Sequence, residues 1–250
     1  MRSRSLGTLS VFALGLLACG GEDSGTDVIQ LDLAPAYTAA GVVQISSPGR
    51  LQPELRPFVM ELSQLSLSGV GILGQAVIQG GTVPLALDGS FDPDRARATF
   101  TGTTATVTST APEEVYGLGF SLVEPRASDG VASELTGYVA SALGVQTRSA
   151  SWSAVLAEDA LALPAPAEES VALQSLGLGR QRVTVGAIDG PSLARILRYS
   201  VILDGAEATS LALSPNGPVS IDLDAVSGDL LVVRYLRNGA FGDAAFFRVP

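Results

Sequence analysis

The stretch "RATFTGTTATVTST", Arg97 to Thr110, indicates the secondary structure that much of the chain repeats. Successive side chains of an extended strand point to opposite faces. Phe100 then falls on one face, while Thr99, Thr101 and Thr103 fall on the other. Because threonine favours strands, this pattern predicts a β-strand with one solvated face.

Turn signals recur on both sides of this strand and separate further short alternating runs. Asp-Gly or Asn-Gly pairs, which favour tight turns, begin at Asp88, Asp129, Asp189, Asp204, Asn216 and Asn238. Short strands spaced in this way are typical of antiparallel sandwiches and barrels. We therefore predict an all-β chain with two antiparallel β-sandwich or barrel-like domains and one short helix.

The N-terminal β domain is expected over residues 28–156. Its candidate strands span residues 28–33, 41–46, 59–68, 75–79, 83–87, 96–109, 115–123 and 146–156. The segment from Leu62 to Leu87 carries no charge, which raises the question of a membrane helix. Its five glycines and the alternation of Leu65, Leu67, Val70 and Ile72 favour strands joined by turns.

One segment of this domain, "SDGVASELTGYVASALG" at residues 128–144, departs from the strand period. Val131, Leu135, Val139 and Ala142 follow helical spacing, and Gly144 would end the helix. We predict a short amphipathic helix that closes one end of the sheet. A strand through residues 135–140 is the alternative.

Residues 157–169, "AEDALALPAPAEE", have the Ala, Pro and Glu content of an exposed, semi-rigid linker, so we place a domain boundary there. The C-terminal domain, residues 170–250, should then be separable by a protease that cuts in the linker. Its candidate strands span residues 171–176, 182–187, 196–203, 208–213, 219–223, 230–236 and 244–249. Seven short strands resemble an immunoglobulin-like or fibronectin-like sandwich, although the Cys and Trp marks of immunoglobulin domains are missing.

The N-terminus has the three zones of a secretory signal: basic Arg2 and Arg4, an uncharged run, and then small or acidic residues. The run ends in Leu16-Leu17-Ala18-Cys19, which holds the only cysteine of the chain and resembles the lipobox of bacterial lipoproteins. The resemblance implies that residues 1–18 are a signal peptide removed before Cys19, whose thiol carries the lipid. Residues 19–27 would form the acylated tether. An ordinary signal peptide cut elsewhere is the alternative.

The composition excludes several kinds of chemistry. The chain has no histidine, and all 15 basic residues are arginine. With Cys19 acylated, it can build neither a Ser-His-Asp triad, nor a Schiff base, nor a Cys- or His-ligated zinc site. Removal of both signal arginines leaves 13 basic against 25 acidic residues, so nucleic acid is not an expected partner.

The surviving chemistry is that of carboxylates. Two acidic residues could serve a glycan-active enzyme, and adjacent pairs occur at Glu113-Glu114, Glu158-Asp159 and Glu168-Glu169. We interpret these pairs as solvated loop charge and predict no catalytic residues.

Two aspartate clusters are weak calcium candidates: Asp88, Asp92 and Asp94, and then Asp222, Asp224 and Asp229. Neither has EF-hand spacing, and aspartate is also common in turns, so we predict no metal site and no cofactor.

The sequence therefore predicts a lipoprotein of the bacterial cell envelope, held in the membrane by acylated Cys19 and serving a binding or scaffolding role. In a Gram-negative host, Gly20 in place of Asp resembles lipoproteins sorted to the outer membrane. The partner would be a protein, a glycan or an apolar ligand. The alternative is a carrier in which residues 28–156 form a half-open barrel around an apolar ligand. Four arginines of the second domain, Arg195, Arg198, Arg234 and Arg237, could share a patch or serve as surface ion-pair partners.

Overall fold

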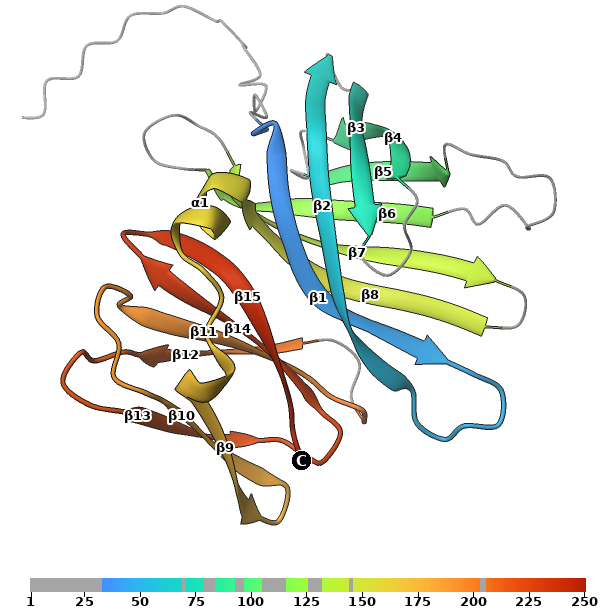
Figure 1. Ribbon diagram of the computed structural model, residues 1–250. Coiled ribbons are helices and arrows are strands. Elements are labelled where there is room, and N and C mark those ends of the chain that lie inside the picture. The colour runs from blue at the N-terminus through green and yellow to red at the C-terminus, as the bar shows by residue number, and fades with distance from the viewer. Residues whose placement is uncertain are drawn as a thin grey trace, which may run out of the picture.

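The computed structural model describes residues 33–68, 71–78, 84–92, 97–104, 116–125, 132–143, 146–202 and 206–250. Within these residues the chain forms two antiparallel β bodies that lie side by side, joined by a short helical segment (Figure 1). The all-β prediction is confirmed.

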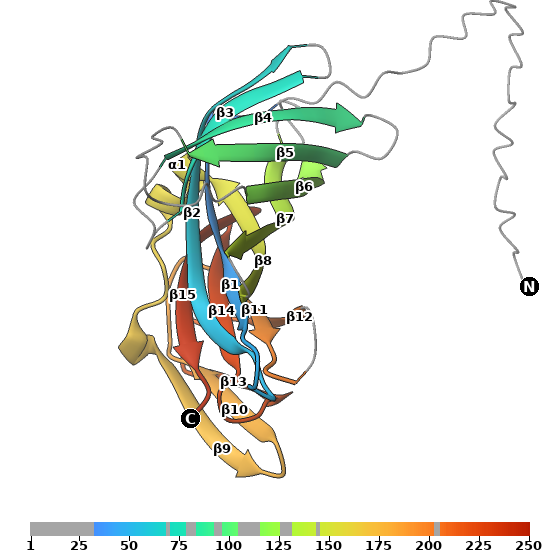
Figure 2. The same ribbon diagram turned by 90° about the vertical axis from the view of Figure 1, so that its right-hand side faces the viewer.

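The first body is a closed barrel in which each strand pairs with the next along the chain, and the last strand returns to pair with the first. Its strands are β1 (Ala36–Ser46), β2 (Glu54–Ser68), β3 (Gly71–Ile78), β4 (Pro84–Asp92), β5 (Arg97–Thr104), β6 (Tyr116–Pro125), β7 (Ala132–Leu143) and β8 (Gln146–Leu156). Figure 2 shows the wall of β3 to β7 turning away from β1 and β2. The inward-facing apolar side chains include Tyr37, Met60, Leu62, Leu135 and Trp152.

The second body is a seven-stranded sandwich. Its strands are β9 (Val171–Gly177), β10 (Arg180–Val185), β11 (Leu193–Tyr199), β12 (Ala206–Ala212), β13 (Val219–Asp224), β14 (Leu230–Arg237) and β15 (Ala240–Arg248). One sheet has the order β13-β10-β9 and the other β12-β11-β14-β15. The fourth strand thus pairs with the third, whereas in an immunoglobulin constant domain it belongs to the other sheet.

The four-stranded sheet is covered on both faces, and β14 shows this most clearly. Leu231 and Val233 belong to the core shared with the three-stranded sheet, whereas Leu230 and Val232 pack against the barrel. A strand buried on both faces needs apolar residues at every position. This explains why "LLVV" at residues 230–233 is continuous instead of alternating.

The helix predicted over residues 128–144 is wrong. Residues 132–143 form β7, which pairs with β6 and β8, while residues 128–131 and 144 lie outside the described residues. Leu135 and Val139 are buried inside the barrel, and Tyr138 between them is 42% exposed. Two side chains that are four residues apart lie on the same face of a strand and also on the same face of a helix. The spacing of Leu135 and Val139 therefore does not distinguish a strand from a helix.

The other predicted strands beyond residue 40 correspond to strands of the structure, although their ends differ by several residues. The seven strands of the sandwich all form, and the barrel strands beyond residue 40 form with shifted ends. The hairpin predicted at Asn238-Gly239 joins β14 to β15, and its two central residues have φ angles of 53° and 82°, as a type I′ turn requires. The expected strand at residues 28–33 lies outside the described residues except for Leu33, which is not in a strand.

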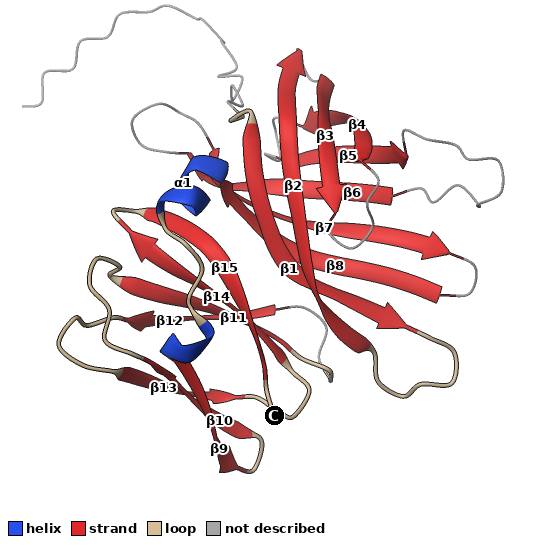
Figure 3. Cartoon of the chain, in the orientation of Figure 1, coloured by secondary structure: helices blue, strands red, loops and turns tan. Residues whose placement is uncertain are grey.

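The connecting segment contains the helix α1 (Ala157–Ala162) and a single 3₁₀ turn, η2 (Glu168–Ser170), both blue in Figure 3. Ala160 and Leu163 are buried, and the backbone carbonyl of Leu163 accepts a hydrogen bond of 2.9 Å from the N–H of Asp243 in β15. The segment is therefore packed against the sandwich and is not the fully exposed linker that its composition suggested.

Gly242 allows this close approach, because a Cβ atom at this position would lie 2.2 Å from the carbonyl oxygen of Leu163. We expect Gly242→Ala to push the connecting segment away from β15 and to lower the free energy of unfolding by about 1–3 kcal/mol, the usual cost of overpacking. Urea titration measures the loss. Gly217→Ala is the matched control, since a Cβ atom at residue 217 would meet no neighbouring atom within 4 Å. Equal stability of the two variants would contradict the close packing.

Candidate functional site

The two bodies meet through an apolar interface between the outer wall of the barrel and the four-stranded sheet. Ala40, Val42 and Leu55 of the barrel pack against Tyr199, Leu230 and Val232 of the sandwich, and all six side chains are buried. The interface is continuous with the surface of β14 described above. The barrel and the sandwich therefore hold a fixed relative position, and a site formed between them has a fixed geometry.

A buried arginine, Arg234, crosses this interface from the centre of β14 and is only 1% exposed. One terminal nitrogen donates to the backbone carbonyl of Gly242 at 2.7 Å, and the other donates to the carbonyl of Ser153 in the barrel at 3.0 Å. Burial lowers the pKa of Arg234 to about 10, while the negative charges of Asp243 and Glu134 act in the opposite direction and raise it. The side chain is therefore still a cation at neutral pH.

Two further arginines of the sandwich also reach carbonyl oxygens that lie outside the sandwich. Arg237 donates to Ala162 at the end of α1 at 2.6 Å, and Arg248 donates to Leu55 at 2.8 Å. The planar guanidinium carries five N–H donors, so it can bind a carbonyl and retain other donors. Together with Arg234, these side chains fasten the sandwich to the barrel and to α1 by charge-assisted hydrogen bonds.

A groove of about 430 Å³ opens where the start of β7, the helix α1, strand β11 and the β14–β15 hairpin meet. We call it the junction groove. Its charged lining consists of Glu134, Asp159, Arg195 and Arg237. Because these residues come from both bodies and from the segment between them, the groove exists only in the assembled chain.

One wall of the junction groove is an Arg195–Glu134 ion pair placed against an aromatic ring. A terminal nitrogen of Arg195 donates to the carboxylate of Glu134, which is 6% exposed. The guanidinium carbon of Arg195 lies 3.8 Å from the centroid of the Phe241 ring, within the range of a cation–π contact. These two contacts hold Arg195 in one orientation, with 28% of its side chain still exposed.

Of the four arginines singled out in the sequence, two share a patch, one forms ion pairs, and Arg234 has neither of the roles considered. Arg195 and Arg237 line the junction groove together, and Arg234 lies in the interface. Arg198 lies elsewhere and pairs with Glu207 at 2.7 Å and with Asp229 at 4.0 Å. The sequence analysis singled out the arginines, and Asp159 as one of an acidic pair, but it did not identify Glu134 or Phe241, since these residues join the groove only through the docking of the two bodies.

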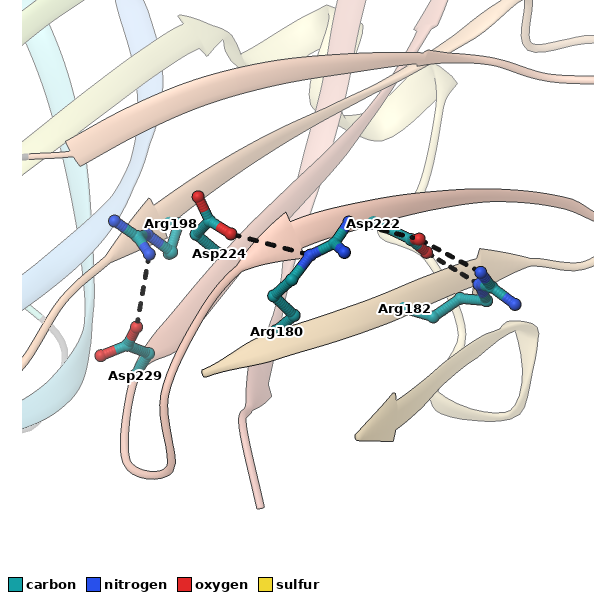
Figure 4. Close-up of polar contacts among 6 residues, drawn as sticks. All are labelled: Arg180, Arg182, Arg198, Asp222, Asp224 and Asp229. Carbon is teal, nitrogen blue, oxygen red and sulfur yellow. Dashed lines mark hydrogen bonds and ion pairs between the residues drawn. The ribbon is translucent and has the colours of Figure 1, made fainter. Parts of the chain in front are cut away.

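The second calcium candidate is occupied by protein partners, as Figure 4 shows. Asp222 binds Arg182 at 2.7 and 3.1 Å, and this contact lowers the pKa of its carboxyl group. Asp224 lies 3.9 Å from Arg180, and Asp229 is fully buried. Its two carboxylate oxygens accept the backbone N–H groups of residues 201 and 226 at 2.9 and 3.1 Å.

The described residues contain no group of three or more acidic, histidine or cysteine side chains arranged to hold a metal ion. Of the first calcium cluster, Asp88 is an exposed residue of β4, the backbone of Asp92 ends that strand, and Asp94 lies outside the described residues. The pairs Glu158-Asp159 and Glu168-Glu169 lie in α1 and η2. Glu113-Glu114 and Cys19 lie outside the described residues.

No family model and no curated protein matches the chain. Among the described residues, no helix combines the length and the apolar character that crossing a bilayer would need. The features that indicate a function are therefore the N-terminal sequence, the barrel and the junction groove.

The interface should be visible in the ionisation of Tyr199. Its hydroxyl donates to the carbonyl of Ser151 at 3.2 Å, and burial raises its pKa to about 12. An unfolded tyrosine ionises near 10. The folded state therefore retains this proton between pH 10 and 12, and the stability that the neutral phenol contributes is complete below pH 10 and is lost as the pH rises toward 12.

We expect the absorbance titration at 295 nm of the wild type to contain one phenol with a pKa near 12 that Tyr199→Phe lacks. The absorbance should be read within milliseconds of a pH jump, before the chain unfolds. Tyr138→Phe, which removes a half-exposed phenol, controls for the loss of one chromophore. If the phenol missing from Tyr199→Phe ionises near pH 10, the interface is open to water.

Proposed function

We propose that this chain is a lipid-anchored lipoprotein of the bacterial cell envelope with a non-catalytic binding or scaffolding role. The observation that carries the proposal is Leu16-Leu17-Ala18-Cys19, which follows a basic start and an uncharged run and precedes a small, acidic stretch. Charge zones, apolar length and the position of the single cysteine all agree with a lipoprotein signal. The outer membrane is the proposed location in a Gram-negative host.

Acylation would make the attachment stable, because several acyl chains bind a bilayer far more tightly than one chain does. Strand β1 begins at Ala36, which is 17 residues beyond Cys19. At about 3.4 Å per residue, this stretch can reach at most roughly 60 Å. The lipid would therefore anchor the barrel and sandwich while leaving them room to meet a partner.

The proposed role is binding and not catalysis. The chain has no histidine and no lysine, and several carboxylates of the described region bind arginine or backbone N–H groups. These acidic groups take part in contacts within the protein, which is a structural role. The junction groove supports a binding role, since it is concave and combines charged side chains with apolar ones.

The anchor is tested by Cys19→Ala. The variant has no thiol to carry diacylglycerol, so cells fed a radiolabelled fatty acid should produce unlabelled protein, and that protein should leave the membrane fraction or stay uncleaved. Ser24→Ala changes the same tether without touching the thiol and should remain labelled. Equal labelling of Cys19→Ala and wild type would refute lipid attachment at this residue.

The carrier alternative receives support from one observation, the closure of the barrel by pairing of β8 with β1. Eight strands enclose an interior that is either filled by side chains or large enough for one small ligand. The buried cluster inside the described part of the barrel consists of apolar side chains, so a ligand held among them would be apolar as well.

The carrier role predicts a stoichiometric lipid or other apolar compound in the organic extract of protein purified without denaturant, identified by mass spectrometry. Trp152, the only tryptophan, belongs to the barrel core, so re-addition of the extract should change its fluorescence. A lipid-free extract together with unchanged fluorescence would leave scaffolding as the supported role.

A further inference from the structure

We propose that the junction groove binds the carboxylate of a short peptide or of an amino-acid derivative with an apolar side chain next to that carboxylate. This inference deepens the binding role proposed above and rests on it. It follows from the arginines that line the groove, from the acidic residues beside them and from the apolar part of the lining.

Arg237 supplies the main recognition group. In the part of the chain that the structure describes, its hydrogen bond goes to the carbonyl of Ala162, and no carboxylate lies within ion-pair distance. That bond places the guanidinium at the edge of the groove and uses one of its five N–H donors. The remaining donors have the fork geometry that suits a carboxylate.

Arg195 supplies a second, oriented guanidinium to the lining. Its terminal nitrogen Nη1 is engaged by Glu134 and its face is covered by Phe241, while the exposed part of the side chain faces the groove. Because both contacts hold Arg195 before any ligand arrives, little side-chain freedom would be lost on binding.

The charge of the lining favours a ligand with a single negative charge. Two arginines and two carboxylates, Glu134 and Asp159, line the same groove, so the formal charges cancel. A dianionic phosphate would meet both carboxylates, and it would also meet the net negative charge of the whole chain, −10. A monocarboxylate carries less charge than phosphate and would meet less of this repulsion.

The remaining lining includes several apolar side chains beside Ser133, Asn238 and Gly239. Leu163, Ala162, Ala240 and Phe241 take part in it, and Leu163 is itself buried against β15. The volume of about 430 Å³ lies in the range of small-ligand sites and suits a di- or tripeptide. An apolar side chain beside the carboxylate would lie against this part of the lining.

The test compares two peptides, Ala-Ala-Leu with a free C-terminus and Ala-Ala-Leu amide. They differ only in the group that the arginines are proposed to recognise. Titration calorimetry uses the full chain carrying Cys19→Ala, so that lipid attachment has no influence on the result. We expect the free acid to bind at least about tenfold more tightly than the amide, and its affinity to fall with added salt.

Arg237→Gln should remove most of this preference. Because it also loses the hydrogen bond to Ala162, its unfolding curve must be compared with that of the wild type. Arg182→Gln is the matched control, since Arg182 is an exposed arginine of the distant three-stranded sheet and pairs with Asp222. Arg195→Gln should also weaken binding, but it unpairs buried Glu134, so its unfolding curve must be compared with that of the wild type.

Equal affinity for acid and amide, no binding of either peptide at millimolar concentration, or unchanged preference in Arg237→Gln would overturn the proposal. None of these outcomes bears on fatty-acid labelling at Cys19, so failure of this site and failure of the anchor remain distinguishable. Binding of inorganic phosphate in place of the peptide acid would also overturn it, because the lining would then be selecting an oxyanion and not a peptide terminus.

Discussion

The arrangement of this protein depends on one strand that has no solvent-exposed face. Along β14, alternate side chains enter two different cores, one inside the sandwich and one against the barrel. Arg234 interrupts this apolar strand on the barrel side, where a buried cation is costly unless its donors are satisfied. Carbonyl oxygens from the barrel and from β15 satisfy two of its nitrogens, so the charge is stable only when the two bodies are docked.

It follows that the sandwich depends on its contacts with the barrel for part of its stability. Removing the barrel would expose Tyr199, Leu230 and Val232 to water and leave Arg234 without its partner at Ser153. Burial of a large apolar side chain stabilises by about 1.5–3 kcal/mol, so the loss of three such contacts compares with the whole stability of a small domain. The connecting segment adds to this coupling, because Leu163 packs on β15 and Ala162 accepts from Arg237.

The strands of the sandwich could be predicted from the sequence because turn residues bound each of them, and Asn238-Gly239 adopts the turn conformation that its composition favours. Strand β7 was mistaken for a helix because Leu135 and Val139 are four residues apart, a spacing that both periods share. The packing of residues 157–163 escaped prediction for another reason. Their Ala- and Pro-rich composition is typical of linkers, and only the approach of Gly242 in β15, some eighty residues away, makes Leu163 part of a core. The junction groove depends on such long-range contacts in the same way.

The use of arginine throughout the chain has a structural consequence at this junction. A lysine ammonium is a compact, strongly hydrated charge, whereas a guanidinium can donate to a backbone carbonyl, stack on a ring and keep other donors available. Arg234 donates to a backbone carbonyl across the interface, and Arg195 stacks on the ring of Phe241. Arg237 donates to a backbone carbonyl and keeps other donors available. The contacts that fix the two bodies are therefore made by the same residue type that lines the groove between them. Because the groove walls are held by these contacts in the chain itself, the proposed binding would require no domain closure, and its specificity would be set by the charge and shape already present.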